Sequence, residues 1–248
     1  MDQVADDESD SRIIFILDES GSMSAYRREA IRGYNDFLVK TQMRDVDADL
    51  TLAVFSGHYT KIVDGQPLHK AAPITGSQYR PHGGTLLWDT VGDLCEGPRP
   101  GGASPYRDPS LLQLSRGAKA EPKLVGEKAH LAKLGLAPEQ WGEQATDDLE
   151  DQRTLVVILT DGYDTNSTRR ESDAREMIDR LEATGLWTFV FLAAGHAKVP
   201  AWFKPGNALD FAMDRLGTVM DTLAEATAKF LESDDDSTET FFLTEGRP

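Results

Sequence analysis

The feature that most constrains the fold is an uninterrupted apolar run that ends in a small polar cluster. Residues 13–17 are apolar and rich in β-formers, Asp18 follows directly, and Ser20 and Ser22 stand at alternate positions around Gly21. An apolar run of this length is typical of a strand buried on both faces, as in a parallel sheet covered by helices. The polar cluster is then predicted to lie at the carboxyl end of the strand, where ligands bind in open α/β sheets.

This cluster offers one carboxylate and two hydroxyls on a tight loop, in which Gly21 can adopt backbone conformations that other residues avoid. Hard divalent cations such as Mg²⁺ prefer oxygen ligands and usually keep some water. A plainer interpretation is that Asp18 or Ser20 caps a helix beginning near Ser24, since Asp and Ser are preferred N-cap residues. Further oxygen donors elsewhere in the chain are needed to support the metal site.

Strand and helix patterns alternate along the rest of the chain. We expect further strands at residues 49–56, 59–63, 153–160, 186–194 and 207–212, and helices at 24–41, 86–94, 170–184 and 214–231. The 59–63 strand follows a Gly-His turn, so it is expected to pair antiparallel at an edge. This alternation predicts an α/β fold: a doubly wound, mostly parallel central sheet with helices on both faces.

The chain divides into three regions by composition. We expect an acidic flexible N-terminus at residues 1–10, one domain over 11–231 and an acidic C-terminal tail over 232–248. A long insertion at about residues 97–151 begins rich in Pro, Gly and Arg, and carries modest helical patterns later. Connections of this length are uncommon in compact domains, and we expect a surface decoration.

Composition excludes several classes of protein. The 42 acidic and 26 basic residues give a net charge of −16, which argues against unspecific binding to nucleic acid or to an anionic membrane. A single cysteine, Cys95, excludes an internal disulfide and a cysteine-built zinc site, and fits a reducing compartment. The start of the chain lacks a secretory signal, and no apolar run approaches the ~20 residues of a membrane-spanning helix. We therefore expect a cytoplasmic protein with no membrane insertion.

Two more oxygen donors stand where the predicted strands and helices put them at the same sheet edge. Thr85 follows Gly83 and Gly84 at a loop-to-helix junction, and the two glycines let the backbone approach a ligand closely. Asp161, followed by Gly162, ends the second fully apolar strand. The carboxyl ends of parallel strands share one edge, so these groups are expected to meet the first cluster there.

Together these residues resemble the metal-ion-dependent adhesion site of von Willebrand factor A-type domains, which has the pattern Asp-x-Ser-x-Ser, then Thr, then Asp. The resemblance covers about residues 11–96 and 152–231, and the form is similar to the small stand-alone bacterial and phage versions, on the segments 17–23, 79–85, 160–162 and 189–192. It implies a Rossmann-like fold. It also implies that hydroxyls of Ser20, Ser22 and Thr85 bind a metal, and that Asp18 and Asp161 bind it directly or through water.

The resemblance further implies a protein interaction module and not an enzyme. Mg²⁺, or Ca²⁺ or Mn²⁺, would accept an Asp or Glu side chain from another protein, in an adaptor or scaffold of a bacterial or phage system. Two alternatives stay open: a metal-dependent hydrolase or phosphatase, and a structural metal with partner binding through the 97–151 insertion. Against the hydrolase, the chain has no Gly-x-Ser-x-Gly, no Walker-type loop and no base evidently paired with a nucleophile.

Residues near these motifs carry weaker expectations. Glu19 is expected to face solvent, and Asp89 to cap its own helix or be solvated. Asp164 and Asn166 are expected to be polar loop residues. The histidines on loops, His58, His69 and His82, stand at no spacing that zinc ligands use.

Overall fold

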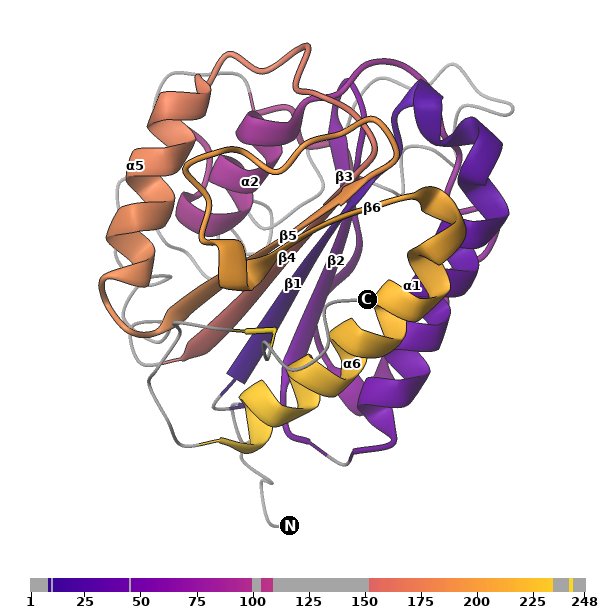
Figure 1. Ribbon diagram of the computed structural model, residues 1–248, viewed down its shortest axis with the longest axis vertical. Helices are drawn as coiled ribbons and strands as arrows, with labels where there is room; N and C mark the ends of the chain where they lie inside the picture. Colours follow the sequence, from indigo (N-terminus) through magenta and orange to yellow (C-terminus); the bar gives the residue numbers. More distant parts are fainter. Residues whose placement is uncertain are drawn as a thin grey trace, which may run out of the picture.

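A six-stranded sheet lies at the centre of the molecule, in the order β3-β2-β1-β4-β5-β6 (Figure 1). The computed structural model describes residues 9, 11–44, 46–99, 104–108, 152–233 and 241–242. The strands are β1 (Ser11–Asp18), β2 (Asp49–Phe55), β3 (Tyr59–Pro67), β4 (Arg153–Thr160), β5 (Trp187–Ala194) and β6 (Ala208–Phe211). All neighbours pair in parallel except β2 and β3, so the predicted antiparallel edge strand is confirmed.

Four α-helices are described: α1 (Arg27–Gln42), α2 (Leu87–Glu96), α5 (Glu171–Glu182) and α6 (Leu216–Glu232). Short 3₁₀ turns are η1 (Gly21–Tyr26), η2 (Leu68–Lys70), η5 (Pro205–Asn207) and η6 (Met213–Arg215). None of these helices combines the length and the apolar character that crossing a membrane requires. The helical patterns expected within residues 109–151 lie outside the described residues, as do most of the N-terminal region and the tail.

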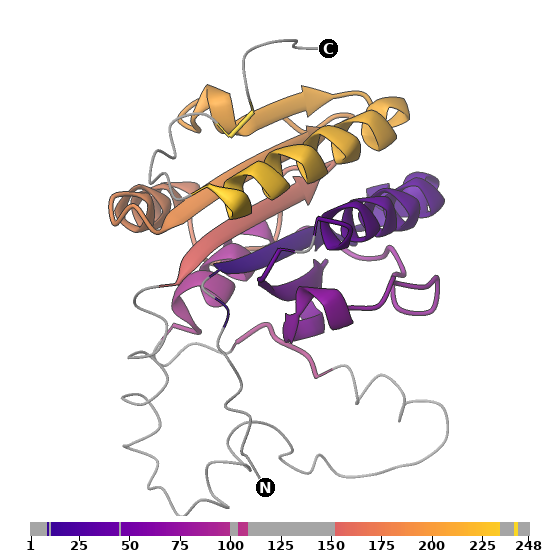
Figure 2. The same cartoon turned by 90° about the horizontal axis from the view of Figure 1, so that it is seen from below.

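The helices cover the two faces of the sheet in pairs (Figure 2). Alternate residues of β1 face opposite sides, as the period of a strand requires. Ile13, Phe15 and Leu17 pack in the core that includes α1 and α6, whereas Ile14 and Ile16 pack in the core that includes α2 and α5. The predicted doubly wound α/β fold is therefore confirmed, and the apolar run is continuous because β1 is buried on both faces.

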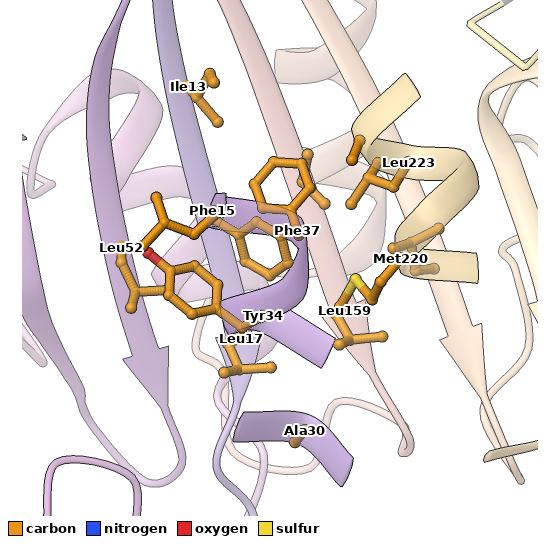
Figure 3. Close-up of a cluster of buried hydrophobic side chains, with 14 of the residues drawn as sticks. Ile13, Phe15, Leu17, Ala30, Tyr34, Phe37, Leu52, Leu159, Met220 and Leu223 are labelled. Carbon is orange, nitrogen blue, oxygen red and sulfur yellow. The ribbon is translucent and has the colours of Figure 1, made fainter. Parts of the chain in front are cut away.

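Aromatic packing anchors α1 to the sheet (Figure 3). The Phe15 ring lies 5.2 Å from the ring of Tyr34, edge to face, and 5.2 Å from that of Phe37. All three side chains are fully buried. Burial of each Phe side chain stabilises the fold by roughly 1.5–3 kcal/mol, so this cluster fixes the middle of β1 against α1.

The edge strand β3 is longer than expected. The strand was expected to end at residue 63, but it continues through Gly65, which has a φ of 54°. The register shifts between Leu50 and Leu52 of β2, and the amide of Gly65 donates to Thr51 Oγ1 at 3.0 Å. A glycine in this conformation makes a bulge, which lets the pairing resume beyond it.

The order in which successive strands are added to the sheet reverses between β1 and β4, which pair in parallel. From β1 the chain passes through α1 to β2 on one side, and from β4 it passes through α5 to β5 on the other. In open α/β sheets ligands bind at the carboxyl ends of the strands at such a switch point. Asp18 ends β1 and Asp161 directly follows β4, so both lie there.

Candidate metal centre

The carboxylate of Asp18 is fully buried and held by two hydrogen bonds. The amide of Ser20 donates to Oδ1 at 2.6 Å, and the hydroxyl of Thr160 donates to Oδ2 at 2.6 Å. The hydroxyl of Tyr79 donates to the backbone oxygen of Asp18, also at 2.6 Å. Burial raises the pKa of Asp18 to about 6, although the hydrogen bonds from Thr160 and Ser20 oppose this rise. The side chain is therefore rigid and costly to ionise without a cation.

Three further side chains with oxygen atoms that could bind a metal form a hydrogen-bonded chain beside Asp18: Ser20, Ser22 and Asp161. The Ser20 and Ser22 hydroxyl oxygens lie 3.1 Å apart, and the Ser22 hydroxyl donates to Asp161 Oδ1 at 2.7 Å. Ser20 and Asp161 are buried, whereas Ser22 is exposed. Burial also raises the pKa of Asp161, against the hydrogen bond from Ser22. The loop after β1 and the loop after β4 thus meet through side-chain oxygens.

Thr85 faces the same space from the loop before α2. A Cβ placed on Gly162 would lie 3.6 Å from Thr85 Oγ1 and 3.9 Å from Ser22 Oγ. Because Gly162 has no side chain, the space between these hydroxyls stays open. The structure therefore brings together all five residues proposed from the sequence, which come from three loops.

Backbone hydrogen bonds tie these three loops to one another. The amide of Gly21 donates to the Gly83 oxygen at 3.1 Å, and the amide of His82 donates to the Glu19 oxygen at 2.8 Å. On the other side, the amides of Thr165 and of Asn166 donate to the Thr85 oxygen at 2.9 and 3.1 Å. The positions of the oxygen donors are therefore set by the backbone and not by side-chain packing alone.

The expectation for Glu19 was wrong. Its side chain is 7% exposed, and its carboxylate accepts a hydrogen bond from the amide of Arg80. Burial raises the pKa of Glu19 to about 7. Solvent exposure was expected because Glu19 stands at a variable position of the Asp-x-Ser-x-Ser motif; the loop of residues 79–82 covers the side chain only in the folded chain.

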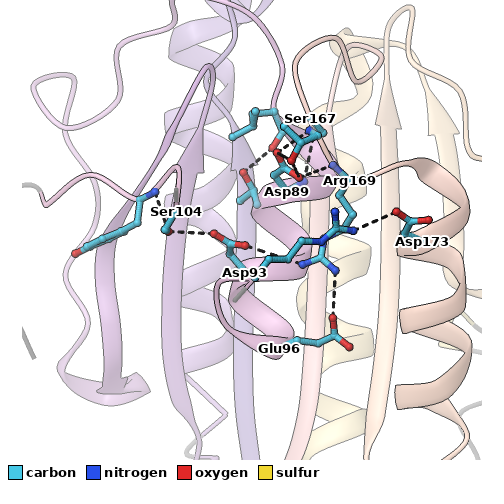
Figure 4. Close-up of polar contacts among 12 residues, drawn as sticks. Asp89, Asp93, Glu96, Ser104, Ser167, Arg169 and Asp173 are labelled. Atoms are coloured by element: carbon cyan, nitrogen blue, oxygen red, sulfur yellow. Dashed lines mark hydrogen bonds and ion pairs between the residues drawn. The ribbon is translucent and has the colours of Figure 1, made fainter. Parts of the chain in front are cut away.

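The expectation for Asp89 was also wrong (Figure 4). Asp89 is buried on α2, and it accepts hydrogen bonds from the amides of Thr168 and Arg169 at 2.8 and 2.7 Å. It therefore caps the loop that leads into α5 and not its own helix. The start of α2 is capped instead by Asp164, whose Oδ1 accepts from the amide of Leu87 at 2.8 Å.

Arg169 extends this network between α2 and α5 (Figure 4). Its side chain is 6% exposed, with ion-pair distances of 3.1 Å to Glu96 and 4.0 Å to Asp93. Gly92 is required beneath it, because a Cβ there would overlap the guanidinium. Sequence reasoning missed Thr160, Tyr79 and Arg169 as supports of the site; for Thr160 the available signal was its place directly before Asp161.

A groove of about 560 Å³ opens beside this site. It runs from Gly162 and Tyr163 along the start of α2 at Trp88 to the residues at the start of α5 and after β5. Tyr163 is 62% exposed at its border. The groove leaves room for a bound molecule to extend past the oxygen cluster.

The donor set suits a hard cation. Every donor is an oxygen, from three hydroxyls and two carboxylates, and hard cations such as Mg²⁺ prefer such ligands. Within the described residues, no group of three or more His, Cys, Asp or Glu side chains could hold a metal. A zinc-type site or a carboxylate cage is therefore disfavoured among these residues, whereas a site built mainly from hydroxyls is compatible with this arrangement.

Comparison with known proteins gives the fold. No protein-family model matches the sequence, and no curated protein matches it. Among solved structures, the von Willebrand factor domain of the type V pili tip protein Mfa5 from Porphyromonas gingivalis matches with a TM-score of 0.52 at 8% identity, over 92% of this chain and 98% of that one. The von Willebrand factor type A protein from Catenulispora acidiphila matches with a TM-score of 0.51 at 15% identity, over 90% of this chain and 43% of that one.

A further match is proximal thread matrix protein 1 from the mussel byssus, with a TM-score of 0.48, 14% identity and coverage of 85% of this chain and 46% of that one. The chain thus spans less than half of two of these three proteins. The sheet order and the position of the oxygen cluster at its switch point define a doubly wound α/β protein with these polar side chains at the carboxyl edge. The particular fold is that of a von Willebrand factor A-type domain.

Proposed function

We propose that this chain is a divalent-metal-dependent protein interaction module. The cation would be held by Asp18, Ser20, Ser22, Thr85 and Asp161, and it would accept an Asp or Glu side chain from a partner protein. The observation that carries the proposal is the convergence of these oxygens, with the Ser22 hydroxyl 2.7 Å from Asp161 Oδ1 and exposed to solvent. A buried oxygen cluster with one exposed member leaves an approach for a ligand.

The chemistry of the donor set favours binding of an external carboxylate. Neutral hydroxyls compensate a cation's charge less than carboxylates do, so a metal in this site would stay electrophilic and keep water-occupied positions. Mg²⁺ usually keeps several waters, and Ca²⁺ and Mn²⁺ also take oxygen ligands. A partner carboxylate replacing one such water would gain a strong contact even though this chain has a net charge of −16.

The geometry gives less support to a hydrolase or phosphatase. Both oxygens of the Asp18 carboxylate already accept hydrogen bonds, and a serine, Ser20, stands where a second carboxylate would assist phosphoryl transfer. Two-metal catalysis needs more carboxylates than the two in this cluster. The third possibility, contacts through residues 97–151, falls largely on residues outside the described part of the chain.

An adaptor or scaffold role in a bacterial or phage assembly follows as part of the same proposal. The partner would be recognised by a carboxylate group. Contact with nucleic acid is not expected, because the net charge would repel it.

Thermal unfolding with and without Mg²⁺ tests the metal site. A ligand that binds only the folded state raises the melting temperature. We expect Mg²⁺ to stabilise the wild-type protein, and Ser22→Ala to lose most of this shift. Ser24→Ala is a matched control, because Ser24 is an exposed serine of the same 3₁₀ turn. An equal Mg²⁺ shift in the wild type and Ser22→Ala would overturn the proposal.

A further inference from the structure

Four basic residues lie on one side of the proposed metal site, and we name them the cationic rim: His58, Arg80, His82 and Arg107. Arg80, His82 and Arg107 are exposed, and His58 is half-buried. Three segments supply them: the turn between β2 and β3, the loop before α2, and residues 104–108. Such a group is unexpected on a chain of net charge −16.

Hydrogen bonds fix the rim next to the metal-binding loops. The amide of His82 donates to the backbone oxygen of Glu19, which stands between Asp18 and Ser20 in the chain. The backbone oxygen of Gly83 accepts a hydrogen bond from the amide of Gly21. The His82 ring lies 5.6 Å from the His58 ring, centroid to centroid. His82 of the rim therefore contacts the backbone of the loop that carries Ser20 and Ser22.

Arg107 is anchored to the same edge by its own backbone. Its amide donates to the Tyr59 oxygen at 2.8 Å, and the Tyr59 amide donates to the Pro105 oxygen at 3.1 Å. Ser104 in the same segment donates to Asp93 of α2 at 3.1 Å (Figure 4). Besides partial burial, the charges of Arg107 and His82 lower the pKa of His58, which places Arg107 within electrostatic reach of the histidine pair.

The rim is suited to an anion and not to a second metal ion. Two facing imidazoles can ligate a metal, but the arginines beside them would repel a cation. No described acidic side chain completes a group of three metal ligands with them. Arginine forms strong, often bidentate hydrogen bonds with carboxylates, so this group has the chemistry of an anion site.

Some cations at the surface of this protein pair with acidic side chains, whereas others, such as Arg28 and Arg44, form no ion pair with a described residue. Arg170 pairs with Asp173 at 2.9 Å, Lys198 with Asp210 at 3.0 Å, and Lys61 with Asp64 at 2.8 Å. Within the described part of the chain, Arg80 and Arg107 form no ion pair with an acidic side chain. Among the described residues, no carboxylate therefore lies within ion-pair distance of their guanidinium groups, although the charge of Arg80 acts on buried Glu19.

We propose that the cationic rim binds an acidic segment of the partner protein, with several Asp or Glu side chains, one of which reaches the metal. This inference rests on the proposed function for that one carboxylate and adds the neighbouring ones. The rim gives local attraction within a repulsive overall field, and at ordinary ionic strength that field is screened beyond roughly 10 Å. A nucleic acid is disfavoured as the occupant, because its dense charge extends far beyond four basic side chains.

Two capped peptides separate the rim from the metal. Penta-glutamate can bind the metal and the rim at the same time, whereas Gly-Gly-Glu-Gly-Gly has one carboxylate side chain and cannot bind both at once. Calorimetric titration with Mg²⁺ at low salt is expected to show penta-glutamate binding about tenfold more weakly to Arg80→Ala/Arg107→Ala than to the wild type, since each exposed pair contributes up to about fivefold. Binding of the single-glutamate peptide should not change. Both side chains are exposed and both backbone hydrogen bonds persist, so the variant is expected to fold.

Arg32→Ala/Arg175→Ala is the matched control, since these arginines are exposed on α1 and α5 and pair only within their own helices. An equal loss of penta-glutamate affinity in this control would overturn the rim, as would tighter binding of an oligothymidylate than of penta-glutamate. The Mg²⁺ shift in melting temperature, measured without peptide, tests the metal site separately. If that shift is absent but the rim variant still loses penta-glutamate, the proposed function fails and the rim stands. If the shift is present but both double variants bind alike, the rim fails and the metal site stands.

Discussion

The Ser22 hydroxyl donates a 2.7 Å hydrogen bond to Asp161 Oδ1, although 139 residues separate the two in the chain. This contact joins the loop after β1 to the loop after β4, at the switch point of the sheet. Both groups are oxygen donors from motifs that the sequence offers separately. Their contact brings the two motifs into one site, in which Asp161 supplies a carboxylate.

Replacing Asp161 with Asn should separate metal binding from folding. The variant keeps the size of the side chain but loses the charge that attracts the cation, so the Mg²⁺ shift in melting temperature should fall to near zero. In chelator the variant should be as stable as the wild type or more so, because burial disfavours the ionised carboxylate and raises its pKa. Asp36→Asn, on the surface of α1, should keep the full Mg²⁺ shift. A strongly destabilised metal-free Asp161→Asn would contradict this account.

Thr160→Val should weaken metal binding without a change in side-chain shape. The Thr160 hydroxyl orients Asp18 through Oδ2, and loss of such a supporting hydrogen bond typically costs about 10–100-fold in metal affinity. The buried acceptor left without its donor should also lower the free energy of unfolding by about 1–3 kcal/mol. Calorimetric titration with Mn²⁺ or Mg²⁺ measures the first effect. Thr160→Ser keeps the hydroxyl and should restore most of the affinity; equal loss in both variants would point to packing instead.

Gly84→Ala should push apart the two loops that carry Thr85 and Asp161. The new Cβ would overlap Asn166 Oδ1 and lie 3.2 Å from Thr165 Oγ1. Overpacking of this kind typically costs about 1–3 kcal/mol, and here it also displaces the Thr85 hydroxyl from the cluster. Urea unfolding in chelator and Mg²⁺ titration give the two readouts. Gly57→Ala is the control, because nothing lies within 4 Å of its new Cβ.

Arg169→Ala should destabilise the fold by about 3 kcal/mol or more, because it leaves the carboxylates of Asp93 and Glu96 without their buried partner. The Arg169 amide still donates to Asp89, so the capped loop keeps part of its support. Urea unfolding measures the loss. Arg175→Ala removes an exposed arginine from an i,i+4 pair on α5 and should change stability by less than about 0.5 kcal/mol. Similar effects of both variants would mean that the buried network contributes little.

The metal-free protein should lose stability as pH rises from about 4 to about 7. Burial raises the pKa of Asp18 to about 6 and of Glu19 to about 7. An acid whose folded-state pKa lies above its unfolded value stabilises the fold fully below the unfolded pKa, and this contribution is lost as pH rises through the folded pKa. Urea unfolding in chelator at pH 5 and pH 7 checks the direction. Asp18→Asn should show a smaller drop between the two; an unchanged drop would contradict the role of Asp18.

The sequence by itself predicted strands buried on both faces with oxygen-bearing side chains at their carboxyl ends, although it did not predict the full length of β3. Residues 13–17 and the apolar run before Asp161 require strands buried on both faces, and such strands put their carboxyl ends at one edge. The five donor residues followed from that placement and from the family resemblance, because motif spacing is a property of the local chain.

Only the tertiary structure decided what surrounds these donors. Glu19 is buried because the loop that carries Arg80 folds over it, and Asp89 caps a loop 79 residues further along. The cationic rim likewise joins His58, His82 and Arg107 from three separate segments. Hydrogen bonds and charges act through space, so contacts between distant segments leave no periodic or local signal in the sequence.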